Sequence, residues 1–373
     1  MEEIIISLII VTISIILLYI INKAYSNKGK KRILSVFNNN INLTSFNKNP
    51  FIILSEEDHV TCFLCLKNKD FLSGQMNGMI SYYNGKTYKA VILIIEHCEP
   101  VTSLFQLNDK TILTSSADGT MKKIKILLKN ENRKKYLVEF VFYTNKEFIF
   151  KSIQIKNSDD IISCNISKEL LLWKKNPNND NPLYKVEKKL LYNEYIRDIL
   201  QINELYFITG GESLQCWNCH NYENMKKLSY NCKGNNSLYR INDEYCGILL
   251  QKDGDILLFN NKTLSEIKIF NITDYTITCM KYLSSNVLVF GFFDNKNKKS
   301  EINQFIIENK NENNNEIKLM KMRSEIFENN QGNSGKNWQR INIIDEIDDK
   351  IFLGLGGEIN MKYFGQIIIF EKT

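Results

Sequence analysis

The feature that most constrains the fold of this 373-residue chain is a sequence unit that occurs seven times. With VTSLFQLNDKTILTSSADGTMKKIKI from Val101 as the template, related segments begin at Val60, Phe150, Ile196, Asn236, Ile277 and Ile341. Most copies start about 40 to 52 residues apart, which is typical of proteins that stack one supersecondary unit against the next. The copies therefore predict one repetitive domain rather than two unrelated ones.

Each copy has the same internal order of apolar runs and turns. An apolar run of about six residues precedes a polar turn, and a second apolar run ends in Ser, Thr or Gly. A third run then ends on a large residue, such as Trp173 or Trp217. In several copies an Asn-Gly or Asp-Gly pair separates the last two runs, at Asn77–Gly78, Asp118–Gly119 and Asp253–Gly254. This chemistry is typical of tight hairpins, so we expect one antiparallel sheet per copy.

The pattern resembles the WD40 repeat, in which each copy is one four-stranded blade of a β-propeller. The resemblance covers Val60 to Phe370 and is strongest in the second copy. That copy has polar residues at the family's positions, namely His97, Ser115, Ser116 and Asp118. Ile124 and Lys125 replace the family's Trp and terminal Asp. In the family, His, Ser/Thr, Asp and Trp form a hydrogen-bonded chain within a blade, and no copy here contains all four.

The two ends of the repeat region predict how the ring closes. The seventh copy stops at Thr373 after three expected strands, and a spare apolar run, FIILS, lies ahead of the first copy at residues 51–55. Pairing this run into the last blade removes an open sheet edge. We therefore expect an all-β, seven-bladed WD40-like propeller over 51–373. Residues 309–337 are interpreted as a low-complexity insertion, with Glu316–Met322 as a candidate outer strand of the sixth blade.

The N-terminal segment predicts a membrane anchor. Residues 4–21 are uncharged and apolar, and as a helix they would span about 27 Å, enough for a thin bilayer. Acidic residues precede the run, and basic residues follow it, among them Lys28, Lys30, Lys31 and Arg32. The positive-inside rule therefore predicts a transmembrane signal-anchor helix over 1–22, a basic, Asn-rich tether over 23–50 and a cytosolic propeller. The short span favours the endoplasmic reticulum or another endomembrane.

A cleaved signal peptide is the alternative interpretation of this segment, because Ala24 and Ser26 have the spacing of a cleavage site. The acidic N-terminus and the length of the apolar run favour the anchor. Nine Cys residues without a paired spacing fit a reducing compartment. Asn-x-Ser/Thr sequons would indicate a lumenal location if occupied, but an Asn-rich chain produces them by chance. They are Asn42, Asn165, Asn235, Asn261 and Asn271.

The sequence contains no recognisable catalytic motif. We find no P-loop, HExxH, GxSxG or dinucleotide-binding fingerprint. Cys216, Cys219 and His220 include zinc-ligand residue types, but no second Cys/His pair lies at zinc spacing. Cys62 and Cys65 would point to opposite faces of a strand. We therefore expect no enzymatic activity, cofactor or metal, and the mild net charge of +6 gives no reason to expect nucleic acid as a partner.

The resemblance also implies which residues face a partner. In the family, the residue after each copy's first apolar position lies on the ring of the partner-binding face. Those positions here hold Thr61, Thr102, Lys151, Arg197, Ser237, Thr278 and Asn342. Lys151 and Arg197 supply neighbouring cations, and a guanidinium matches phosphate or carboxylate oxygens, so we expect an acidic or phosphorylated protein partner. A local salt bridge of Arg197 with Asp198 or Glu194 is the alternative.

Together these features predict a membrane-tethered, non-catalytic protein-interaction scaffold on the cytosolic face of an endomembrane. The basic residues after the span also offer contacts to anionic lipid headgroups. Three alternatives remain open. The chain is a structural subunit of a membrane complex, a vesicle-trafficking factor similar in outline to the Sec12-type exchange factors, or a secreted or lumenal propeller with a cleaved N-terminal segment.

Overall fold

The computed structural model describes residues 52–372 except for 129–134, 145–146, 179–181, 192–193, 229–235, 251–254, 272–275, 295, 298, 310–316, 328–337 and 360–361. The predicted anchor (1–22) and tether (23–50), with Lys28, Lys30, Lys31 and Arg32, lie outside the described residues. Within the described part of the chain, no helix has the length and apolar character needed to cross a membrane. All regular elements in this part are β-strands.

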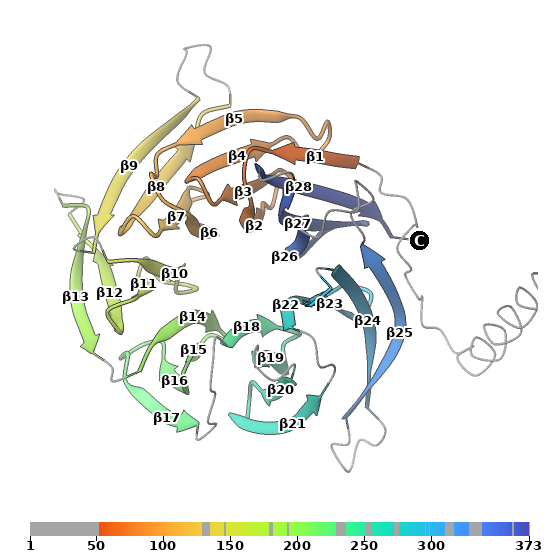
Figure 1. Cartoon of the computed structure of the whole chain (residues 1–373). Coiled ribbons are helices and arrows are strands. Elements are labelled where there is room, and N and C mark those ends of the chain that lie inside the picture. The colour runs from red at the N-terminus through yellow and green to blue at the C-terminus, as the bar shows by residue number, and fades with distance from the viewer. Residues whose placement is uncertain are drawn as a thin grey trace, which may run out of the picture. The chain divides into compact units, whose positions relative to one another are not determined.

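These strands form seven antiparallel, four-stranded sheets arranged as blades around a ring (Figure 1). Blade 1 contains β2 (Val60–Cys65), β3 (Phe71–Gln75), β4 (Met79–Tyr83) and β5 (Ala90–Ile95). Blade 2 contains β6 (Val101–Gln106), β7 (Ile112–Ser116), β8 (Thr120–Ile126) and β9 (Tyr136–Tyr143). Blade 3 contains β10 (Ile149–Gln154), β11 (Ile161–Asn165), β12 (Glu169–Lys175) and β13 (Tyr184–Leu191). Blade 4 contains β14 (Ile196–Gln201), β15 (Tyr206–Gly211), β16 (Leu214–Asn218) and β17 (Asn224–Leu228).

The remaining blades complete the ring and confirm the seven-bladed fold predicted from the repeats. Blade 5 contains β18 (Asn236–Arg240), β19 (Tyr245–Leu250), β20 (Asp255–Asn260) and β21 (Ser265–Asn271). Blade 6 contains β22 (Thr276–Tyr282), β23 (Val287–Asp294), β24 (Lys299–Asn309) and β25 (Ile317–Phe327). Blade 7 contains β26 (Trp338–Ile347), β27 (Lys350–Ile359), β28 (Lys362–Glu371) and β1 (Ile52–Glu56).

The ring closes through β1, which pairs antiparallel with β28 and places Ile52 opposite Ile369. The run expected at 51–55 thus supplies the fourth strand of the last blade. The side chain of Glu56 also links β1 to blade 1, where its carboxylate accepts hydrogen bonds from Gln75 Nε2 at 2.8 Å and Ser81 Oγ at 3.0 Å. β1 therefore lies where the first and last blades meet.

The core lies between neighbouring blades. The second strand of a blade is buried along its whole length, as in β3, β7 and β11, because another blade packs on each side. Between blades 2 and 3, Met121 and Phe142 pack against Ile161 and Trp173. Outer strands alternate between buried and exposed residues instead, as along β5. At the tight turns, Gly78 (φ 84°) and Gly119 (φ 79°) have the positive φ expected of the glycine in an Asn-Gly or Asp-Gly hairpin.

Residues 317–327 of the segment interpreted as an insertion (309–337) form a strand, and most of the remainder lies outside the described residues. β25 (Ile317–Phe327) pairs with β24 along the outer edge of blade 6. It includes nearly all of the candidate strand Glu316–Met322 and extends beyond it. The segment IKLMKMRSEIF alternates apolar and polar residues only in part, from Ile317 to Leu319 and from Met320 to Arg323. Its charge and the Asn-rich flanks concealed this alternation, and the flanks lie outside the described residues.

Candidate functional site

We call the ring face the side of the propeller at which the innermost strand of each blade begins. In six blades, this end of the innermost strand contains a bulge with one extra residue. The bulged residues are Thr61, Thr102, Phe150, Arg197, Thr278 and Asn342. In blade 5, β18 pairs without interruption from Asn236 to Arg240, and the half-buried Ser237 lies opposite Leu249. A bulge redirects its extra side chain, so the same point of each blade presents one residue at this face.

The structure corrects the alignment of the third copy by one residue. Its bulge is Phe150, and Lys151 takes the place that Asp198 has in blade 4. The cause is the turn after β10. Gln154 pairs with Ile161, whereas the equivalent Gln106 pairs with Ile112, so this turn is one residue longer. A gapless alignment that matched the second strands therefore shifted the first strand of this copy by one residue. The residue at the bulge of blade 3 is Phe150, and Lys151 is the residue after it.

Most polar residues at the bulges bind the next blade. Thr61 Oγ1 donates to Val101 O at 2.5 Å, and Thr102 Oγ1 donates to Ile149 O at 2.7 Å. Asn342 Nδ2 donates to Val60 O at 2.8 Å. Thr278, which is buried, donates within its own blade to Gly291 O at 3.0 Å. These side chains, predicted from the resemblance to face a partner, are thus hydrogen-bonded inside the ring.

Lys151 and Asp198 form an ion pair that joins three blades. Lys151 Nζ lies 3.0 Å from Asp198 Oδ1, and the second carboxylate oxygen accepts a hydrogen bond from Leu238 N at 2.9 Å. Burial disfavours the charge of Lys151, but the attraction of Asp198 outweighs it, so the pKa of Lys151 is raised. The salt bridge that the sequence suggested for Arg197 with Asp198 is therefore made by Lys151 instead.

Arg197 lies against aromatic rings. Its guanidinium carbon is 5.5 Å from the centroid of Phe150 and 6.0 Å from that of Tyr195. Phe148 packs on Phe150 at 4.8 Å, and Lys168 Nζ lies 4.6 Å from the Tyr195 centroid. We call these five half-buried residues the aromatic–cation cluster. Among the described residues, no ion-pair or hydrogen-bond partner of the Arg197 side chain is found.

The sequence identified Arg197 but missed its surroundings. Phe148 and Tyr195 immediately precede the innermost strands of adjacent blades, Phe150 occupies the bulge of blade 3, and Lys168 comes from the turn after β11. A search for charge alone could not detect them. Adjacent aromatic residues just before the first apolar position in the third and fourth copies were the available signal. Ile166, whose backbone N–H donates to Phe148 O at 2.8 Å, is 44% exposed and extends the cluster with an apolar surface.

The hydrogen bonds of the His, Ser/Thr, Asp and Trp residues that the resemblance implies occur in different blades, and no described blade has all of them. In blade 2, His97 lies 2.9 Å from Asp118 Oδ2 through Nδ1 and 2.8 Å from Thr114 Oγ1 through Nε2. The hydroxyl partner is thus Thr114, not Ser115 or Ser116 as the alignment suggested. In blades 3 and 4 a Trp indole donates instead, from Trp173 to Ser163 at 2.9 Å and from Trp217 to Thr209 at 3.1 Å.

The cysteine pairs have no arrangement suited to metal binding. Within the described residues, no group of three or more His, Cys, Asp or Glu side chains is placed to hold an ion. Cys216 and Cys219 are buried, and this burial raises the pKa of their thiols to about 11 and about 12. Thiols in this environment stay protonated near neutral pH and are poor ligands and nucleophiles.

Comparison with known proteins places the chain by fold. No protein-family model and no curated protein sequence matches it. Among 1277 similar chains of solved structures is the β-propeller domain of Cps50 (Swd1) from Myceliophteria thermophila. That match has a TM-score of 0.64 at 10% sequence identity and covers 87% of this chain and 99% of the other. The chain is a seven-bladed β-propeller, and so low an identity shows the fold alone.

Proposed function

We propose that the chain is a non-catalytic protein-interaction scaffold whose ring face binds a partner through the aromatic–cation cluster. The observation that carries this proposal is the environment of Arg197. At equivalent bulges, Thr61, Thr102 and Asn342 donate hydrogen bonds to the neighbouring blade. The Arg197 guanidinium lies instead between the rings of Phe150 and Tyr195. Its donors therefore remain available to a ligand.

The composition of the cluster supports a protein partner. Arg and Tyr are the residues that most often dominate the energy of protein–protein interfaces, and Phe is enriched there. The aromatic rings hold the guanidinium in place by cation–π contact, worth about 0.5–1 kcal/mol at an exposed site, so less entropy is lost when it binds. Arg197 and Lys168 favour an acidic or phosphorylated segment, because a guanidinium binds two oxygens at once. Ile166 adds an apolar contact beside them.

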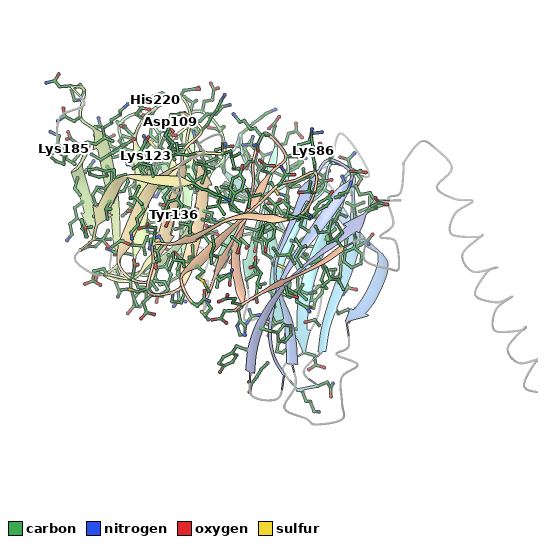
Figure 2. The ribbon with its side chains drawn as sticks, turned by 90° about the horizontal axis from the view of Figure 1, so that it is seen from above. Lys86, Asp109, Lys123, Tyr136, Lys185 and His220 are labelled. Carbon is green, nitrogen blue, oxygen red and sulfur yellow. The ribbon has the colours of Figure 1, made fainter. Side chains whose placement is uncertain are left out.

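Charge reversal at Arg197 tests this function. We expect Arg197→Glu in the full chain to remove partners from the set recovered by proximity labelling in cells, because the new carboxylate repels an acidic segment. Lys185→Glu is the matched control, since Lys185 is an exposed cation on the outer strand of blade 3 (Figure 2). An unchanged partner list for a folded Arg197→Glu variant contradicts the proposal. Lys151 is unsuitable for this test, because its ion pair with Asp198 holds the blades together.

We further propose that an N-terminal anchor tethers the propeller to the cytosolic face of an endomembrane. Support comes from residues 4–21, the basic flank, and two sequons in the propeller. Asn165 and Asn261 are each 1% exposed, and their amides donate to Glu169 Oε2 at 2.9 Å and Asn242 O at 3.2 Å. A glycan on either residue is incompatible with this fold, as an acceptor Asn must lie at the surface.

Extraction and glycosylation measurements test the anchor. We expect the full chain to stay in the membrane fraction at alkaline pH, to keep its N-terminus intact and to carry no N-glycan. Protease added to sealed microsomes should digest the propeller, because it faces the cytosol. A mature N-terminus near Asn27 or protection of the propeller inside the vesicles would instead favour the secreted or lumenal alternative.

A further inference from the structure

The side of the propeller opposite the ring face has a groove between blades 1 and 2. We call this side the turn face, because the turns between the first and second strands lie there. Asp109 in the β6–β7 turn, Lys86 in the β4–β5 turn and His220 in the β16–β17 turn lie along this side (Figure 2). The groove has a volume of about 860 Å³. This volume falls within the range of about 300–1,000 Å³ that is typical of ligand sites.

The groove has an apolar floor and a polar rim. Leu66 and Ile112, which are buried, form part of the floor, and Leu128, 51% exposed, extends it to the surface. Lys67, Gln106 and Lys110 belong to the rim. A site with this lining buries apolar side chains of a ligand and orients the ligand by a few polar contacts.

A comparison with other blade junctions shows which polar groups in the groove lack the hydrogen bond that their counterparts make. At two junctions, a Gln side chain at the end of the first strand accepts a hydrogen bond from the preceding blade's turn. Asn108 N donates to Gln154 Oε1 at 2.7 Å, and Lys156 N donates to Gln201 Oε1 at 2.8 Å. Glu346 accepts from Ser284 N in the same way at 2.8 Å between blades 6 and 7. These bonds close the junctions at the turn face.

The junction between blades 1 and 2 has the same groups without this bond. Leu66, Leu107 and Ile155 each begin the turn with an equivalent backbone hydrogen bond, which makes Lys67 the counterpart of Asn108 and Lys156. Gln106 is likewise the counterpart of Gln154. Neither Lys67 N nor the Gln106 side chain has a hydrogen-bond partner among the described residues. One backbone donor and one amide side chain are therefore available at the groove.

The charges of the groove are also uncompensated. Within the described chain, Lys67 and Lys110 make no ion pair, and the nearby Asp109 is paired with Lys123 at 2.7 Å. The smaller groove around Lys156 and Arg240 is different, because its charges neutralise one another. There, Lys156 lies 3.6 Å from Glu204, and Arg240 lies 2.7 Å from Asp243.

We propose that the groove between blades 1 and 2 is a second binding site, which takes a short acidic and apolar segment of a partner protein. An apolar side chain of the segment packs on Leu66, Ile112 and Leu128, and its carboxylate lies between Lys67 and Lys110. A main-chain carbonyl of the segment accepts from Lys67 N, and a main-chain N–H donates to the Gln106 side-chain oxygen. The segment thus replaces the bond that closes the equivalent junctions. This site is independent of the ring-face site, because it lies on the opposite side of the ring.

A peptide library tests the proposal with the full chain. Selection of phage-displayed random peptides should enrich sequences with acidic and apolar residues, and a synthetic peptide of the enriched sequence then serves as the probe. We expect Lys67→Glu with Lys110→Glu to weaken its binding at least about tenfold, and Gln106→Leu to weaken it less. Lys156→Glu is the matched control for the substitution at Lys67, since it reverses one charge at the equivalent turn position, and it should leave binding unchanged.

The outcomes separate this site from the ring-face site. Peptides that bind Arg197→Glu normally but fail to bind the Lys67→Glu, Lys110→Glu variant support the groove. Peptides that show the reverse dependence overturn it and belong to the ring face. A selection that enriches no acidic and apolar peptides also overturns it. The unfolding midpoint of each variant, compared with that of the unsubstituted chain, shows whether weaker binding reflects the site or the fold.

Discussion

Replacement of Trp173 by alanine is expected to lower the free energy of unfolding by about 3–5 kcal/mol. Trp173 is 5% exposed and packs edge-on against Phe142 of the neighbouring blade, with ring centroids 5.3 Å apart. Its indole also donates to Ser163, so truncation leaves a cavity between blades 2 and 3 and a buried hydroxyl without its donor. Chemical denaturation of the full chain measures this loss.

Two further variants show which part of Trp173 matters. Trp173→Phe keeps most of the apolar contact but removes the donor, and we expect a loss of about 1–2 kcal/mol. Val186→Ala is the control, because Val186 is 44% exposed on the outer strand of the same blade and should change stability by less than about 0.5 kcal/mol. A loss for Trp173→Ala no larger than that of Val186→Ala would show that the blade interface does not depend on this ring.

Replacement of His97 by alanine is expected to destabilise the fold by about 2–4 kcal/mol. His97 is buried between Asp118 and Thr114, and its removal takes one hydrogen-bond partner from a largely buried carboxylate and one from a buried hydroxyl. His220→Ala is the matched control, since His220 is an exposed turn residue. Equal unfolding midpoints for the two alanine variants would contradict a structural role for this network.

The same network predicts sensitivity to acid. Burial opposes the charge of Asp118, but hydrogen bonds from His97 and Thr120 outweigh burial and hold the pKa of Asp118 well below its usual value. A carboxyl with a lowered pKa stabilises the fold above its unfolded pKa of about 3.9, and this contribution is lost as the pH falls toward the folded value. The stability difference between the native chain and Asp118→Asn should therefore be largest near neutral pH and shrink below about pH 4. A difference that stays constant down to pH 2 argues against it.

The repeat, the turns and the closing strand were predictable because each depends on a local pattern. Gly78 and Gly119 have the positive φ that their Asn-Gly and Asp-Gly pairs require. The pairing of β1 with β28 followed from one missing strand at the end of the chain and one spare strand at its beginning. The strand Ile317–Phe327 was only partly recognised, since its alternation is weak beside its charge and Asn-rich flanks.

The candidate sites were predictable only in part. Arg197 was identified from its position in the repeat, whereas Lys151 was assigned to the ring because a turn one residue longer was not visible without the pairing of Gln154 with Ile161. The aromatic rings around Arg197 come from two blades, and Lys168 comes from a turn. The groove at Lys67 could not be predicted, because the sequence shows a Gln at position 106 as in the neighbouring copy but does not show that its side chain leaves Lys67 N without a hydrogen bond.

By itself, the sequence determined the all-β class, the seven blades, the turn positions and the way the ring closes, because these follow from periodic patterns within each copy. Only the tertiary structure decided which side chains meet across the blades. It pairs Lys151 with Asp198, joins Thr61 to the carbonyl of Val101, and leaves Arg197 against Phe150. These contacts join residues in different copies of the repeat. A turn that is one residue longer shifts the register of the adjoining strand and so changes all the contacts that this strand makes.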